Sequence, residues 1–275
     1  MRRRQFLHAG LGLGALAGFA ELTPASASLT WAHRSLLGFG TTLSLQAGHE
    51  DVRTLDRALD AAVRTLRRIE SQMSLFDPAS ALSRLNREGE LMSPPAELVE
   101  ILDIAHNISR DHDGAFDVTV QPLWRVFAHA QREGRLPDRR EIRDARAKVD
   151  WRALQVSARR IRFDMPGMAA TLNGIAQGYA ADRVRTVLAS HGIAHALLDA
   201  GEFAPLGATR EARPWTLGIA DPRAEDALIA RLMTDGRCVA TSADNLTTFS
   251  ADHRHHHIFD PRTGYSPTGL SAVTV

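Results

Sequence analysis

The chain has 275 residues, of which 33 are Lys or Arg and 32 are Asp or Glu. This length suffices for one large domain with a sizeable core, and the even charge balance offers neither the basic field of a nucleic-acid-binding protein nor a long acidic tail. The single cysteine, Cys238, excludes an intramolecular disulfide and any metal site built from several cysteines of this chain. We expect Cys238 to be a small buried apolar residue.

The N-terminus predicts export. Three arginines at positions 2–4 precede an apolar, glycine-rich stretch over 9–20, and small side chains stand at Ala25 and Ala27. This order is typical of a twin-arginine signal peptide over residues 1–27, with cleavage near Ala27. The apolar stretch is short for a membrane span. We therefore expect a periplasmic protein, with an uncleaved anchor at the inner membrane as the alternative.

The remaining chain alternates between helical and strand periods without an internal repeat, which predicts one α+β domain over 30–275. Ser93 and Pro94 are expected to cap and start a helix that runs through Ile108. The other helices are expected over 51–71, 121–133, 139–148 and 173–190. Strands are expected at 41–45, 154–156, 160–163, 196–199, 215–219, 228–233, 238–240 and 271–275. Strands and helices do not follow a regular βαβ order, so a doubly wound fold is not predicted.

Six short segments carry residues suited to chemistry. They are M-S-L-F-D-P (73–78) with its continuation to residue 86, D-G-A-F-D (113–117), T-L-N-G-I-A-Q-G-Y-A (171–180), L-D-A-G-E-F (198–203), A-T-S-A-D (240–244) and H-H-I-F-D-P-R-T-G-Y (256–265). Small residues at a helix start let a diphosphate approach the backbone, and His257 can exchange a proton near neutral pH. From the residues alone, Asp117 is expected to cap a helix-to-loop junction, and His257 can equally be a structural hydrogen bonder.

Taken together, these segments resemble the ApbE family of FAD:protein FMN transferases in order and spacing, and the last segment matches the family almost residue for residue. The resemblance implies a T-fold-related domain of mixed strands and helices. It also implies a reaction that cleaves the pyrophosphate of FAD, passes FMN to a Thr or Ser hydroxyl of a target flavoprotein and releases AMP with the help of Mg²⁺.

The resemblance assigns roles to individual residues. His257 is the candidate that helps to deprotonate the acceptor hydroxyl, and Gly174 is the candidate carbonyl ligand of Mg²⁺. The candidate flavin-binding residues are Phe39, Phe76, Ala115, Phe116, Asp117, Thr171, Gln177 and Phe259. For the phenylalanines at positions 39, 76 and 259, packing in the core is the alternative.

The chain also departs from the family pattern. Thr171, Asn173 and Gln177 stand where the family has aspartate, glycine, and lysine or glutamate, so charged contacts to the cofactor are lost. Ala243 replaces a glycine and is expected to be strained if that position needs a positive φ. The family's further metal ligands, an aspartate and a threonine, follow the strand over 271–275. We therefore expect a C-terminally incomplete domain, either a fragment of an active enzyme or a form limited to flavin binding.

Two other functions remain open at this point. One is a flavin-binding accessory protein of a periplasmic respiratory complex, with weak or no transferase activity and a membrane-associated partner. The other is transition-metal binding by His253, His255, His256 and His257. Adjacent histidines of a strand point to opposite faces, so at most two of these would share a site. No nucleic-acid partner is expected.

Overall fold

The computed structural model describes residues 28–275 except residue 225. The predicted signal peptide over 1–27 lies outside the described residues. Within the described part, no helix has the length and apolar character needed to cross a membrane.

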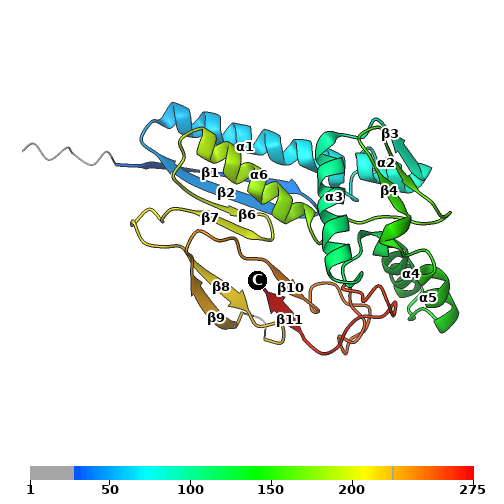
Figure 1. Ribbon diagram of the computed structural model, residues 1–275. Helices are drawn as coiled ribbons and strands as arrows, with labels where there is room; N and C mark the ends of the chain where they lie inside the picture. Colours follow the sequence, from blue (N-terminus) through cyan, green and yellow to red (C-terminus); the bar gives the residue numbers. More distant parts are fainter. Residues whose placement is uncertain (1–27, 225) are drawn as a thin grey trace, which may run out of the picture.

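The centre of the molecule is a four-stranded antiparallel sheet in the order β1–β2–β6–β7. Its strands are Thr30–Gly38, Thr41–His49, His195–Asp199 and Phe203–Leu206. Along β2, Leu43, Leu45 and Ala47 are fully buried and alternate with more exposed polar residues, so one face of the sheet is apolar. Helices α1 (Val52–Met73) and α6 (Ala176–Ser190) lie side by side across the sheet (Figure 1).

Helix α1 forms where a capping residue meets an amphipathic pattern. The side chain of Asp51 accepts hydrogen bonds from the amides of Arg53 and Thr54, two donors that the helix itself cannot satisfy. Leu55, Leu59, Leu66 and Ile69 recur at helical spacing and are buried against the sheet side, which joins the helix to the main core.

Smaller helices and sheets extend the molecule beyond this core (Figure 1). A three-stranded sheet in the order β3–β5–β4 is built from Glu90–Met92, Arg160–Phe163 and Leu154–Val156. The helices here are α2 (Ala81–Glu88), α3 (Ala96–Asp111), α4 (Gln121–Arg132) and α5 (Arg139–Arg146), with short 3-10 helices η1 (Val118–Val120) and η2 (Trp151–Ala153). A second apolar cluster consists of Leu123, Phe127, Ile142, Ala145, Phe249 and Phe259.

The C-terminal third forms two separate two-stranded sheets. One pairs β8 (Thr216–Ala220) with β9 (Leu228–Met233), and the other pairs β10 (Thr241–Ala243) with β11 (Ala272–Thr274). Beyond β11, Val275 exchanges two backbone hydrogen bonds of 3.0 Å with Ala240. The mixed architecture agrees with the predicted α+β class.

The structure corrects four local predictions. Ser93 does not cap α3, because it has a positive φ of 49° and the helix begins at Ala96 without a side-chain cap. Helix α6 begins at Ala176, three residues after the expected position. Residues 238–240 form no strand, and Val239 makes only an isolated bridge to Phe203. Strands β1, β3 and β7 are not predicted at all.

Two further expectations for single residues also change. Ala243 is buried in β10 and does not have a positive φ, so the chain holds alanine there without strain. Cys238 is only partly buried, and its sulfur accepts a hydrogen bond of 3.1 Å from Arg185. The charge run in α5 lies on the surface as expected, with Ile142 and Ala145 turned inward.

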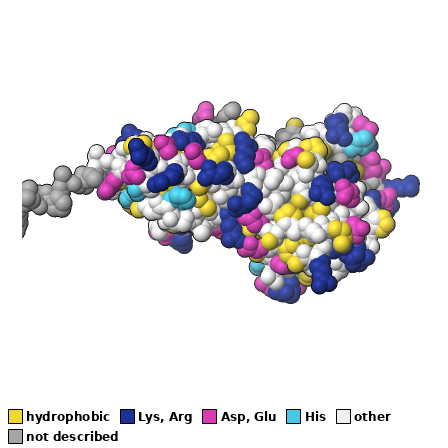
Figure 2. Space-filling view, turned by 90° about the horizontal axis from the view of Figure 1, so that it is seen from above, with side chains coloured by type: hydrophobic (Ala, Val, Ile, Leu, Met, Phe, Trp, Pro, Cys, Tyr) yellow, Lys and Arg dark blue, Asp and Glu magenta, His cyan; other side chains and the backbone are white. Residues whose placement is uncertain are grey.

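Charged side chains of both signs are interspersed over the face seen in Figure 2. Dark blue Lys and Arg groups alternate with magenta acidic groups, and no broad field of one sign covers this face. The view agrees with the even charge balance of the sequence, which gives no electrostatic reason to expect nucleic acid as a partner.

Candidate functional site

The loop after α3 is held by Asp117, which is buried. Its Oδ1 accepts hydrogen bonds of 2.7 Å from the amide and the hydroxyl of Thr119, and its Oδ2 accepts one of 3.0 Å from the amide of Trp151. Burial raises the pKa of Asp117, and these hydrogen bonds act against that rise. Asp117 is therefore the cap that the residues alone predict, and the exposed Ala115 and the half-buried Phe116 stand just before it.

The start of α6 lies against this loop. The amide of Thr171 donates a 2.7 Å hydrogen bond to the carbonyl of Val118. Gly174 faces Phe116, because a Cβ at position 174 would stand 3.7 Å from the Phe116 ring. The predicted segments over 113–117 and 171–180, which are far apart in sequence, therefore lie side by side.

The first turn of α6 carries free backbone donors. It has no side-chain cap, and among the described residues the amides of Gln177 and Gly178 have no backbone acceptor. These amides add to the positive end of the helix dipole. Such a helix start favours an anionic group such as a phosphate.

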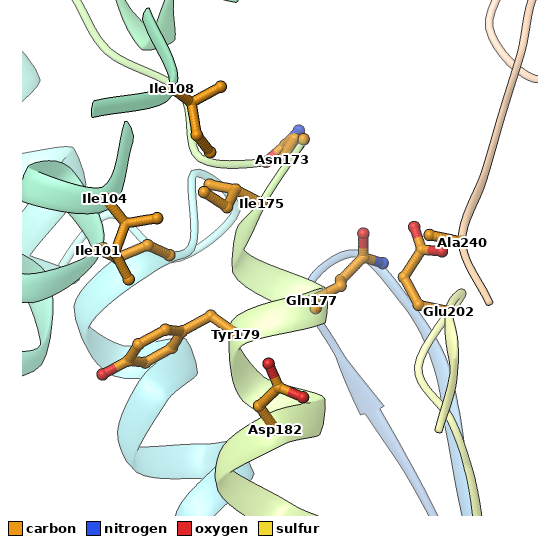
Figure 3. A pocket seen from close by; sticks show the side chains of 12 residues that line it. Ile101, Ile104, Ile108, Asn173, Ile175, Gln177, Tyr179, Asp182, Glu202 and Ala240 are labelled. Atoms are coloured by element: carbon orange, nitrogen blue, oxygen red, sulfur yellow. The ribbon is translucent and has the colours of Figure 1, made fainter. Parts of the chain in front are cut away.

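A pocket of about 340 Å³ opens at this helix start. Its lining comes from α3, from the α6 start, from the β6–β7 turn and from the segment before β10. Ile101, Ile104 and Ile108 form one wall, whereas Gln177 and Glu202 point toward one another on the other side (Figure 3). The volume falls in the range of small-molecule sites, and the pocket combines an apolar wall with a few polar groups.

Glu202 is the carboxyl group of this pocket with a shifted pKa. Burial raises the pKa of Glu202, while the hydrogen bond that its Oε2 accepts from the amide of Thr241, 3.2 Å long, lowers it. Gly201 has a φ of 86°, and a Cβ there would stand 2.9 Å from Nε2 of Gln177. Glycine at position 201 therefore serves both the tight turn and the close approach of Gln177.

The predicted residues Phe39 and Phe76 both lie at the β1–β2 hairpin. Phe39 and Gly40 form the two-residue turn, with positive φ angles of 53° and 78°. A bulky residue rarely adopts this conformation. The amide of Phe39 donates a 2.9 Å hydrogen bond to Glu70 on α1, which holds the turn in place. Phe76 is 64% exposed and its ring covers Gly40, whereas Phe39 packs partly against the core.

His257 lies half-buried in the loop between β10 and β11. Its amide donates to the carbonyl of Thr247, and its Nδ1 lies 3.3 Å from the same oxygen. A carbonyl only accepts, so Nδ1 carries the proton and Nε2 keeps a free lone pair. Burial lowers the pKa of His257, which favours this neutral form at neutral pH. The ring therefore fits the role of a base.

Three other residues of the last segment make contacts within the fold. His256 is buried, and its Nε2 lies 2.9 Å from the carbonyl of Pro267. Phe259 is 8% exposed and packs on Phe127, with ring centroids 5.1 Å apart. This packing favours the core alternative for Phe259. Gly264, at a φ of 80°, lets the turn approach α4 and α5.

Comparison with known proteins agrees with this arrangement of segments. The family model described as "ApbE family" matches residues 39–275. The chain belongs to the ApbE family. A "FAD:protein FMN transferase" of Klebsiella pneumoniae (strain 342) is 32% identical over 219 residues, which are 77% of this chain and 65% of that protein. The same description is carried by a Salmonella typhimurium protein that is 30% identical, over 70% of this chain and 58% of that protein. The chain thus spans less than two thirds of the length of these relatives.

A solved ApbE structure has the same fold. The ApbE protein from Thermotoga maritima superimposes with a TM-score of 0.79 at 27% identity, covering 89% of this chain and 81% of the other. The similarity over most of the chain confirms the ApbE-like α+β architecture that the sequence predicts.

The described part of the ApbE chain holds no cluster of metal-binding side chains. No group of three His, Cys, Asp or Glu side chains there is placed to hold a metal ion. No three of the four histidines over 253–257 thus come together as a metal site. Gly174, the predicted carbonyl ligand, is exposed at the pocket. Its carbonyl alone is a poor Mg²⁺ site, because that ion demands six ligands in octahedral geometry.

Of the predicted ApbE site residues, Gly174 and Gln177 line the pocket, and Phe116 borders Gly174. His257, Phe259, Phe39 and Phe76 are not part of the pocket lining. Sequence reasoning missed the isoleucine wall and the role of Glu202 in the pocket. Ile104 and Ile108 are four positions apart on α3, which places them on one face of a helix. That spacing alone predicts a buried face, so only the position of α6 identifies the pocket.

Proposed function

We propose that this chain is an FAD:protein FMN transferase that moves FMN from FAD to a Thr or Ser hydroxyl of a target flavoprotein, in a Mg²⁺-dependent reaction that releases AMP. The observation that carries the proposal is the pocket at the start of α6. It combines the free amides of Gln177 and Gly178 with an apolar wall. An anionic diphosphate joined to flat ring systems has complementary chemistry.

The bonds of the transfer balance without any redox step. The acceptor hydroxyl oxygen attacks the phosphorus on the FMN side of the pyrophosphate, and the bond from that phosphorus to the bridging oxygen breaks. AMP leaves with the bridging oxygen. The hydroxyl proton passes to Nε2 of His257, whose other nitrogen is held by the carbonyl of Thr247. The phosphate left on the protein is the diester linkage of FMN.

Magnesium, when bound, neutralises charge on the transferring phosphate. Its part in the proposal depends on the family resemblance, since no group of three His, Cys, Asp or Glu side chains among the described residues is placed to hold a metal ion. Gly174 is the residue of this chain that would contribute a carbonyl.

Export to the periplasm is the corresponding proposal for location. It depends on the three arginines at 2–4 and the apolar stretch over 9–20, which precede the domain. The acceptor would then be a flavoprotein of that compartment, including one anchored in the membrane.

Mass spectrometry of an acceptor tests the transfer. A purified flavoprotein domain is incubated with this chain, FAD and Mg²⁺, beside reactions with EDTA and reactions without the chain. A mass gain equal to FMN in the complete reaction alone supports the proposal. A mass gain that persists with EDTA would show that the transfer does not need magnesium.

The second candidate is a flavin-binding accessory protein. The neutral residues Thr171 and Gln177, where the family has charged ones, favour this alternative. Tight binding of FAD without a mass gain on any acceptor would support it. Failure to bind FAD at all would reject both functions.

A further inference from the structure

We propose that Tyr179, Glu100 and Arg183 form a positioning network that holds the first turn of α6 at a fixed distance from α3, and thereby sets the width of the pocket. The inference deepens the proposed function and depends on it where FAD is the ligand. None of the three residues is assigned a role by the family motifs.

Tyr179 joins the pocket to the network. It lines the pocket on α6 and is 8% exposed, and its hydroxyl donates a 2.8 Å hydrogen bond to Glu100 on α3. Arg183 pairs with the other oxygen of Glu100, and its guanidinium lies 4.8 Å from the centre of the Tyr179 ring. Two helices that are remote in sequence are thus connected by one carboxylate.

Helical spacing makes this connection act on the pocket walls. Glu100 precedes Ile104 and Ile108 by four and eight positions on α3, so all three lie along the same side of the helix. On α6, Tyr179 follows Gln177 by two residues and Arg183 follows Tyr179 by four. A shift of the α3–α6 separation at Glu100 would therefore change the gap between the isoleucine wall and the first-turn amides.

The tyrosine hydroxyl keeps its proton over any working pH. Burial, and then the hydrogen bond to Glu100, raise the pKa of Tyr179 to about 12. The hydroxyl therefore donates to Glu100 throughout, and the connection does not switch with pH.

A neighbouring network on the same helix provides a matched control. Glu97, three positions before Glu100 on α3, accepts two hydrogen bonds from Arg68 and one from Gln72. These partners belong to α1, and none of them lines the pocket. The side chain of Glu97 is also less exposed than that of Glu100, 20% against 47%. Loss of Glu97 should therefore disturb overall stability at least as much as loss of Glu100.

The test compares Tyr179→Phe, Glu100→Ala, the double variant and Glu97→Ala. Dissociation constants for FAD are measured by titration, and exchange of the hydrogen-bonded α6 amides, from Tyr179 onward, is measured by hydrogen-exchange mass spectrometry without ligand. We expect Tyr179→Phe to raise the Kd about fivefold, the loss typical of one hydrogen bond. Glu100→Ala should raise it at least as much, because it also removes the pairing with Arg183. The double variant should be no weaker than the weaker single variant, because both remove the same connection.

Glu97→Ala should leave the Kd and the exchange of these amides near the wild-type values. The proposal is overturned if Tyr179→Phe and Glu100→Ala bind FAD as the wild type does, or if Glu97→Ala weakens FAD equally. If the wild type binds no FAD, the proposed function fails. The hydrogen-exchange measurement, which needs no ligand, still tests whether the network positions α6. Unchanged exchange of the α6 amides in both network variants would then reject it.

Discussion

His257 has a free Nε2, and burial lowers its pKa, so the ring is neutral and able to accept a proton at neutral pH. Replacing it with asparagine keeps a polar side chain but removes the base. We expect His257→Asn to slow the transfer of FMN by about 100-fold or more, while the Kd for FAD changes little. Single-turnover transfer assays and FAD titrations measure the two quantities. An equal loss of rate and FAD affinity would instead make His257 a binding residue.

The same histidine predicts a pH dependence. A base acts in its neutral form, and burial places the pKa of His257 below its ordinary value of 6.5. The transfer rate should therefore be maximal at neutral pH and fall in mild acid, with a midpoint below 6.5. Rates measured between pH 5 and 8 check this. In the His257→Asn variant this acid limb should be absent.

Asp244 gives a second pH effect, on stability. Its two oxygens accept hydrogen bonds of 2.6 and 2.5 Å from Arg223, which lowers the pKa of Asp244 below 3.8. The folded carboxyl then holds its proton less tightly than the unfolded one. The stabilisation is therefore complete above pH 3.8 and is lost as the pH falls through the folded pKa.

Arg223→Leu should accordingly lower the urea midpoint at pH 7, and its deficit against the wild type should shrink below pH 3.8. Urea titrations at pH 7 and pH 3 measure this. Arg213→Leu is a suitable control, because Arg213 is largely exposed and its ion pair with Glu211 is 4.0 Å long. A deficit that is the same at both pH values would contradict the role of the Asp244 charge.

Helix α2 depends on a buried serine. The hydroxyl of Ser80 accepts a 3.0 Å hydrogen bond from the amide of Ser83 and donates one of 2.6 Å to the carbonyl of Ser74. Ser80→Ala removes both bonds and should cost about 1–2 kcal/mol of unfolding free energy. Chemical denaturation measures the change. Ser83→Ala, which removes only a 3.2 Å bond to the same carbonyl, should cost less.

At the scale of the whole molecule, two separate apolar clusters hold the fold. The smaller one joins α4 and α5 to the loop that carries His257, through Phe127, Phe249 and Phe259. Phe127 is 1% exposed. Phe127→Ala should cost about 3–5 kcal/mol, and Phe127→Leu much less, because it leaves a smaller cavity. Thermal and urea unfolding measure both. Equal, small losses in the two variants would show that the cluster does not anchor the loop.

Local patterns in the sequence determined most of the helices and strands. The strands at 154–156, 160–163 and 228–233 have the predicted bounds. The ends of α1 and α4 lie within one or two residues of the predicted ends of these helices. These segments have alternating or helical apolar patterns, which act over neighbouring residues. The failures have local causes as well: Ser93 resembles a cap but has a positive φ, and the strand expected at 238–240 begins at Thr241 instead.

The family, the α+β class and the segments that resemble the family could be identified from the sequence by itself, because each segment is a run of adjacent residues. The pocket could not. Its walls come from α3, α6, the β6–β7 turn and the segment before β10, which only the folded sheet and helices bring together. Likewise, Tyr179 meets Glu100 across 79 residues, and Phe259 packs in the smaller apolar cluster. Contacts between distant segments depend on how the elements pack, and a local sequence pattern does not determine that packing.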